Sequence, residues 1–131
     1  MAVDPSRIRD VPLFAGLTEE ERAAVAQKLN ERQIKEGRRL STEGGSGYFF
    51  FVIETGSATV SHGDTVVATL GPGDFFGEAA ILETTRRTAD VTAATDMTVF
   101  QMFGADFAVL NAQSPAVKAA IDAAMAERLP G

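Results

Sequence analysis

The residues best suited to chemistry lie between positions 71 and 91. Residues 78–82 have the composition of a short helical turn, and Gly77 before it lets another group approach the backbone closely. The start of such a turn presents unpaired amides and the positive end of the helix dipole, which attract a phosphate or a carboxylate. Arg87 carries a planar guanidinium that holds two phosphate oxygens at once, whereas the carboxylate of Glu78 suits a neutral donor such as a sugar hydroxyl. Together these residues indicate a site for a sugar phosphate.

Each of these features also has a purely structural explanation. Glycine commonly precedes a helical turn, an arginine in a loop is commonly solvated, and a glutamate at a helix start commonly stabilises the dipole. Helix N-termini are far more frequent than the anion sites built on them, so these residues by themselves favour the structural interpretation.

Short strands must position this segment. From Gly37 onward, glycines separate short stretches rich in Val, Thr, Phe and Ala, as antiparallel strands joined by turns require. Ala58 and Val60 alternate with hydroxyl side chains, which gives the period of two of a half-buried strand. Strands this short and evenly spaced predict a sandwich or a barrel. We expect them at residues 48–54, 57–61, 65–70, 90–94 and 97–102.

Helices are predicted on both sides of the strands. Thr18 and Glu21 form a capping box that begins a first helix, which runs to about Leu29 and has only a narrow apolar stripe. A short helix is expected over 105–112. Ser114-Pro115 then begins a final helix of about a dozen residues, whose apolar face should pack on the strands or on a partner.

Composition excludes several classes of protein. The 131 residues fit one domain, and the shares of 45% hydrophobic and 23% charged residues exclude disorder. A net charge of −6 has the wrong sign for a broad nucleic-acid-binding face. Because there is no cysteine, disulfides, thiolate metal sites and thiol enzymes are excluded, and a cytoplasmic location is expected. No apolar run approaches the roughly 20 residues that cross a bilayer, and the first residues lack a secretory signal.

No metal site or catalytic centre is visible in the sequence. His62 is the one histidine, and we interpret it as an exposed residue of the turn near Gly63-Asp64. Metal-dependent enzymes on β-sandwiches use two or three histidines at one site. A nucleophile with an adjacent base is likewise missing. The chain is therefore not expected to be an enzyme.

The order and spacing of residues 76–91 resemble the phosphate-binding cassette of the cyclic-nucleotide-binding domains, the type found in the catabolite activator protein and in kinase regulatory subunits. The matching residues are Phe76-Gly77-Glu78, Ile81-Leu82 and Arg87-Thr88-Ala89-Asp90-Val91. The resemblance covers nearly the whole chain. It extends to Pro12–Leu17, the Glu43-Gly44 turn before Tyr48–Ile53, Gly56 before Val60, and Leu70–Asp74.

The resemblance implies a role for each cassette residue. Arg87 and the backbone amides of Ala79 and Ala80 would bind the cyclic phosphate. Glu78 would accept the ribose 2′-hydroxyl, and Gly77 would allow the sugar close to the backbone. The remaining predicted ligand-binding residues are Thr88, where the family touches phosphate or base, and its neighbour Ala89.

The resemblance also implies the architecture. We expect a mainly β domain with flanking α-helices, built as an antiparallel β-roll, a jelly-roll-like double-stranded β-helix. A single domain would span residues 1–131. It would comprise a helical lead at 1–36, the β-roll at 37–103 with the cassette at 76–91, and the C-terminal helices at 104–131.

Several residues depart from the family pattern. Arg86 stands where proline is frequent before the arginine, and Ala79 replaces a larger apolar residue. Asp90 stands where Thr or Ser is usual and adds a negative charge near the phosphate unless its side chain points outward. Because no aromatic residue follows Phe107, the lid over the base would be aliphatic, from Ile121 or Met125, or absent.

Two functions remain open at this stage. The first is a regulatory module that binds a cyclic nucleotide, cyclic AMP rather than cyclic GMP, with no cofactor beyond this ligand. The second is a relative of the fold that has lost the ligand and serves protein interaction or oligomerisation. Expected partners are an effector domain, fused or separate, and a second copy in a homodimer. Neither direct DNA binding nor a membrane span is expected.

Overall fold

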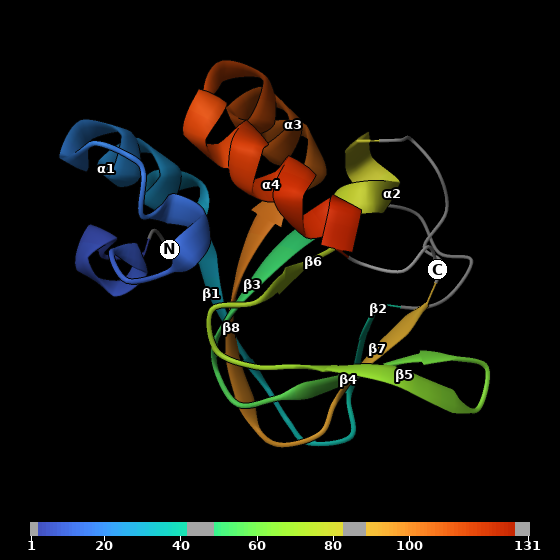
Figure 1. Ribbon diagram of the computed structural model, residues 1–131. Coiled ribbons are helices and arrows are strands. Elements are labelled where there is room, and N and C mark those ends of the chain that lie inside the picture. Colours follow the sequence, from blue (N-terminus) through green and yellow to red (C-terminus); the bar gives the residue numbers. More distant parts are fainter. Residues whose placement is uncertain (1–2, 42–48, 83–88, 128–131) are drawn as a thin grey trace.

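The computed structural model describes residues 3–41, 49–82 and 89–127 (Figure 1). Within these residues, eight strands form two antiparallel four-stranded sheets. Sheet A has the order β1-β8-β3-β6 and sheet B the order β2-β7-β4-β5. The strands are β1 (Asn30–Ile34), β2 (Arg39–Ser41), β3 (Phe49–Thr55), β4 (Ala58–His62), β5 (Thr65–Leu70), β6 (Phe75–Phe76), β7 (Asp90–Ala93) and β8 (Met97–Phe103).

The chain passes repeatedly from one sheet to the other. β1 and β3 of sheet A lead into β2 and β4 of sheet B, and β7 of sheet B leads into β8 of sheet A. Two of these connections contain a glycine in the left-handed conformation. Gly37, between β1 and β2, has φ +88°, and Gly56, between β3 and β4, has φ +87°. The predicted mainly β fold, an antiparallel β-roll with flanking helices, is confirmed.

Helices cover the side of sheet A that faces away from sheet B (Figure 1). The helices are η1 (Pro5–Ile8), η2 (Pro12–Phe14), α1 (Glu19–Lys28), α2 (Glu78–Leu82), α3 (Gly104–Gln113) and α4 (Pro115–Glu127). The predicted capping box of α1 is present, because the Thr18 side chain accepts from the Glu21 amide and the Glu21 side chain accepts from the Thr18 amide. The Ser114 hydroxyl caps α4 by accepting from the Val117 amide.

Two hydrophobic clusters form the core. The helical cluster lies between the helices and sheet A, and the inter-sheet cluster lies between sheets A and B. The helical cluster contains Val3, Ile8, Val11, Leu13, Phe14, Leu17, Val25, Ala26, Leu29, Phe50, Val52, Phe75, Phe100, Met102, Phe107, Val117 and Ile121. The inter-sheet cluster contains Ile34, Phe51, Ile53, Ala58, Phe76, Val91, Ala93, Met97 and Val99.

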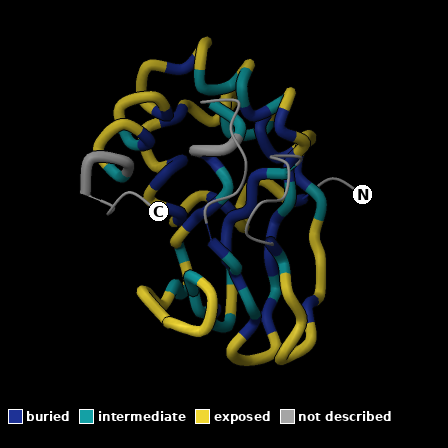
Figure 2. Tube along the Cα trace, turned by 90° about the vertical axis from the view of Figure 1, so that its right-hand side faces the viewer, coloured by how far each residue is buried: buried dark blue, intermediate teal, exposed yellow. Residues whose placement is uncertain are grey.

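Strand β3 is buried on both faces from Phe50 to Ile53. Phe50 belongs to the helical cluster and Phe51 to the inter-sheet cluster. A strand with a layer on each side reads as a continuous apolar run, and alternation between core and solvent disappears. Figure 2 shows the same contrast, with buried central strands and exposed hairpin ends.

The five strands predicted from the sequence are confirmed to within one residue at either end. Three others, β1, β2 and β6, were not predicted. β1 lies inside the segment 1–36 that we expected to be a helical lead. Its sequence NERQI buries only Ile34, so it carries no alternating apolar signal. β2 and β6 have three and two residues, too few for any periodicity.

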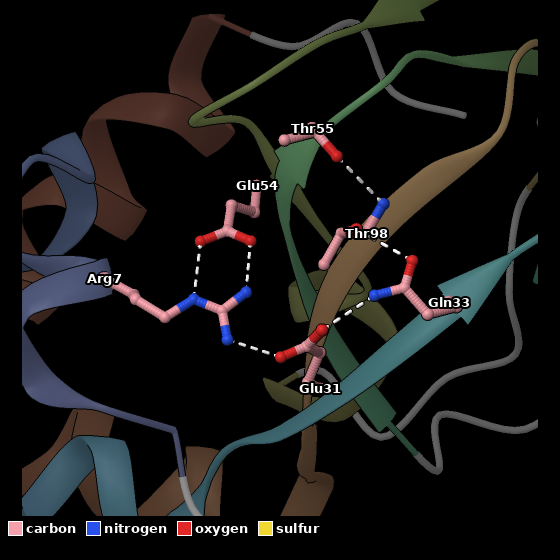
Figure 3. Close-up of polar contacts among 6 residues, drawn as sticks. All are labelled: Arg7, Glu31, Gln33, Glu54, Thr55 and Thr98. Atoms are coloured by element: carbon pink, nitrogen blue, oxygen red, sulfur yellow. Dashed lines mark hydrogen bonds and ion pairs between the residues drawn. The ribbon is translucent and has the colours of Figure 1, made fainter.

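Arg7 fastens the N-terminal segment to sheet A (Figure 3). Arg7 belongs to η1. Its guanidinium donates to both carboxylate oxygens of Glu54 on β3 and also forms an ion pair with Glu31 on β1. The same group lies 5.1 Å from the centre of the Phe100 ring on β8. These hydrogen bonds raise the pKa of Arg7 above its already high ordinary value and lower the pKa of Glu31.

Candidate ligand-binding site

The predicted cassette begins where sheet A ends. β6 pairs with β3 through Phe76↔Phe51 and Val52↔Phe75, and the rings of Phe51 and Phe76 stack with centroids 4.8 Å apart. Gly77 follows with φ +98°, a left-handed conformation that favours glycine. This turn redirects the chain from a buried strand into α2.

Glu78 is the first residue of α2, and its side chain is only 3% exposed. A carboxylate is rarely buried this deeply unless polar groups surround it. α2 contacts β3 and α3, and its residues Ile81 and Leu82 pack against the helical cluster. The start of the cassette is therefore attached to the core through β6 and α2.

The end of the predicted cassette leads into sheet B. Ala89 is 8% exposed and directly precedes β7. Val91 and Ala93 point into the inter-sheet cluster, so Asp90 and Thr92 lie on the outer face of sheet B. Asp90 thus points outward, the orientation that removes its charge from the inside of the roll. Its carboxylate also pairs with Arg39 on β2 at 3.9 Å.

The seven predicted ligand-binding residues divide into three groups. Gly77, Glu78 and Ala89 lie as just described, at the two ends of the cassette. Ala79 and Ala80 belong to α2, as the sequence predicted for a short helical turn. Arg87 and Thr88, together with Arg86, lie outside the described residues. The assignment of all seven to ligand binding stays a prediction.

Ile121 is not a lid in this structure. Its side chain is 0% exposed and belongs to the helical cluster. The apolar positions of α4 recur at helical spacing, which does not distinguish a helix packed on the core from one covering a ligand. The side chain of Met125, the other expected lid residue, lies outside the described part of the chain.

His62 is not in a turn, contrary to our interpretation. It is the last residue of β4, it is half-buried, and the turn that follows consists of Gly63-Asp64. The signal that could have placed it is the alternation of Ala58 and Val60, because the next position on the same face is 62.

Three features of the described residues bear on other functions. No group of three or more His, Asp or Glu side chains that could hold a metal ion occurs in this part of the chain. A pocket of about 160 Å³ is lined by residues that include Ile34, Thr55 and Met97 and do not include Glu78. Among the helices of the described residues, none is long and apolar enough to cross a membrane.

Comparison with known proteins identifies the fold and the family. Residues 31–114 match the model of the cyclic nucleotide-binding domain family. The cAMP-dependent protein kinase regulatory subunit of Yarrowia lipolytica is 39% identical over 94 residues, which are 70% of this chain and 25% of that protein. The chain therefore spans about a quarter of the length of this relative.

Two solved structures have the same architecture. The regulatory domain of Toxoplasma gondii PKA, crystallised with cAMP, matches with a TM-score of 0.83 and 25% identity over 95% of this chain and 49% of that chain. The catabolite activator protein of Thermus thermophilus matches with a TM-score of 0.78 and 28% identity over 89% of this chain and 57% of that chain. The two kinase relatives are named as a regulatory subunit and a regulatory domain, in agreement with the prediction that the domain is not an enzyme. On its fold, its cassette sequence and its family match, this chain belongs to the cyclic nucleotide-binding domain family.

Proposed function

We propose that this domain binds cyclic AMP in preference to cyclic GMP and acts as a cytoplasmic regulatory module. The observation that carries the proposal is the buried carboxylate of Glu78, held behind Gly77 at the end of β6 in a chain of this family. The preference for cyclic AMP is supported by the relatives, because both the kinase subunit of Y. lipolytica and the T. gondii structure carry cAMP in their names.

The proposed contacts divide the nucleotide among the cassette residues. Arg87 and the amides of Ala79 and Ala80 hold the cyclic phosphate through charge-assisted hydrogen bonds. Glu78 accepts the ribose 2′-hydroxyl. Gly77 and Ala89 leave room for the ligand on either side, and Thr88 faces the phosphate or the base.

The proposed output is a shift in population between two arrangements of the helices. Ile81 and Leu82 of α2 pack against the same cluster that holds Val117 and Ile121 of α4. A ligand that moves α2 therefore changes the packing of α4. The size of the shift is limited by the difference in ligand affinity between the two arrangements. An effector domain, fused or separate, would receive it.

Thermal and calorimetric titrations with the two cyclic nucleotides test the proposal. A ligand at a hundred times its dissociation constant should add about 2.7 kcal/mol to the stability of the folded state. Arg87→Ala should weaken cyclic AMP binding by about 2–5 kcal/mol, while the neighbouring Arg86→Ala serves as the matched control and should change it much less. No stabilisation by either nucleotide would instead support a domain that has lost its ligand and serves protein interaction.

A further inference from the structure

We propose that the edge strand β5 pairs with β5 of a second copy of this chain and so joins two B sheets into one. Sheet B has the order β2-β7-β4-β5, so β5 is bonded to β4 on one side, and within the described residues no strand lies on its other side. The strand is on the side of the roll away from the helices (Figure 1). The contact is separate from the proposed nucleotide site, because β5 ends at Leu70 and the cassette begins at Phe76.

The side chains of β5 are open to solvent along almost the whole strand. Residues 65–69 are all exposed, and Leu70 is half-buried. Val66 and Val67 are among the large hydrophobic residues that the described part of the chain leaves exposed, at 59% and 51%. The outer side of an edge strand also presents a row of backbone N–H and C=O groups, and the group that matches such a row is another strand.

The other three sheet edges among the described residues are protected against such pairing. β1 carries Glu31 and Arg32, and Glu31 is held by Arg7 of η1. β2 has three residues and includes the charged Arg39, and β6 has only two residues. Charged side chains and short length are the usual means by which proteins protect an edge. β5 has neither, since its six residues TVVATL contain no charge and no proline.

The distribution of charge favours a second copy as the partner. The chain has a net charge of −6, so two copies repel each other across much of their surfaces. Residues 65–73 contain no charged side chain. When two β5 strands pair end to end in antiparallel orientation, Asp64 of each copy falls opposite Gly71 of the other. Asp74 is directed back to its own turn, where its carboxylate accepts from the Gly71 amide. The two copies therefore meet here without opposing like charges.

Symmetry and size define what kind of assembly results. Two antiparallel copies of β5 are related by a two-fold axis, so each covers the edge of the other and the assembly stops at two chains. A strand of this length spans about 20 Å, and one such pair buries less than the roughly 1,200 Å² of a standard stable interface. Val67 is an extra residue between the partners of Val60 and Ser61, and such a bulge interrupts regular pairing. The dimer is therefore weak and depends on protein concentration.

Analytical ultracentrifugation without nucleotide, from about 10 µM to about 1 mM protein, covers the range of weak dissociation constants. The wild-type mass should rise from 13.9 kDa toward twice that value. Val67→Lys and, as a second variant, Thr69→Lys should stay monomeric throughout, because lysine on an edge strand opposes pairing. Ala119→Lys adds the same charge at an exposed position of α4 and should dimerise like the wild type. Melting curves verify that each variant is folded.

Hydrogen exchange locates the contact within the chain. Once half or more of the wild-type chains are paired, the amides of β5 should exchange about 2-fold or more slowly than at the lowest concentration, while those of β1 should not change. A wild type that stays monomeric at about 1 mM, or a dimer that survives both Val67→Lys and Thr69→Lys, overturns the pairing through β5. Either result leaves the proposed nucleotide binding untouched, because no nucleotide is present in these measurements.

Discussion

The central strands of sheet A are packed on both faces, whereas sheet B is packed on one. In β3 of sheet A, Phe50–Ile53 are all buried, and they alternate between the two clusters. In β5 of sheet B, residues 65–69 are all exposed, including Val66 at 59% and Val67 at 51%. The difference indicates that sheet A carries most of the stability, while the outer side of sheet B tolerates change. Substitutions on the outer face of sheet B should therefore leave the domain folded.

The largest expected effect comes from truncating a residue between sheet A and the helices. Phe50 is 0% exposed, and its ring stacks on Phe107 with centroids 4.1 Å apart. Phe50→Ala should destabilise the domain by about 3–5 kcal/mol, because it removes this burial and leaves a cavity. The measurement is urea unfolding followed by circular dichroism. Val66→Ala on β5 is the control, and its free energy of unfolding should stay within about 0.5 kcal/mol of wild type. Equal losses of stability in the two variants would contradict the contrast between the sheets.

The crossings between the sheets offer a matched pair of glycines. Gly56 and Gly37 have the same left-handed φ, but a Cβ on Gly56 would lie 2.4 Å from the Asp96 carbonyl oxygen, whereas a Cβ on Gly37 would meet nothing within 4 Å. Gly37→Ala should lower the free energy of unfolding by about 1 kcal/mol, because alanine is strained in the left-handed conformation. Alanine at position 56 has the same conformational strain, and its Cβ must also displace backbone atoms. Gly56→Ala should therefore lose about 1 kcal/mol or more of stability beyond the loss in Gly37→Ala.

Unfolding curves of the two alanine variants decide this point. Equal stabilities would show that the crossing at Gly56 relaxes as easily as the open one at Gly37. That result would remove the steric argument for glycine at this crossing.

The smallest of these effects is expected at the contacts of Arg7 with sheet A. Arg7→Met keeps the aliphatic stem but removes the charge, and should cost about 1 kcal/mol at neutral pH, as exposed ion pairs and a cation–π contact do. Arg7 lowers the pKa of Glu31 through a hydrogen bond. A carboxylate with a lowered pKa stabilises the fold above its unfolded-state pKa, and this contribution is lost as the pH falls through the folded-state value.

The stability difference between wild type and Arg7→Met should therefore be constant near neutral pH and shrink below about pH 4. Chemical unfolding from pH 7 to pH 3 measures it. Arg9→Met, on a neighbouring exposed arginine, should show no such pH dependence. A difference that grows on acidification would contradict the assignment.

Local signals in the sequence predicted those parts of the fold that local interactions determine. Thr18 and Glu21 cap α1 by bonds across three residues, and the strand at 65–70 is bounded by glycines, so both were predictable. β1 was not, because a polar strand at the edge of a sheet is specified by its pairing with β8, which is distant in sequence. The double burial of β3 likewise depends on which layers cover it.

The same distinction applies to the site. The order of residues in 76–91 indicated the family, and Glu78 begins α2, the short helical turn predicted at 78–82, directly after the left-handed Gly77. The orientation of Asp90 and of His62 depends on the register of β4 and β7, which the sequence alone does not set. Helical periodicity also could not tell that the Ile121 side chain packs into the core rather than over a ligand.

The central claim is that a cyclic nucleotide binds with its sugar at Glu78, and calorimetry with cyclic AMP and 2′-deoxy cyclic AMP tests it most directly. The wild type should bind cyclic AMP about 10-fold or more tightly than the deoxy ligand, the amount expected from one hydrogen bond to a charged group. In Glu78→Gln, verified as folded by its melting curve, this preference should fall below about 3-fold. No binding of either ligand by the wild type, or the same preference in both proteins, would contradict the account.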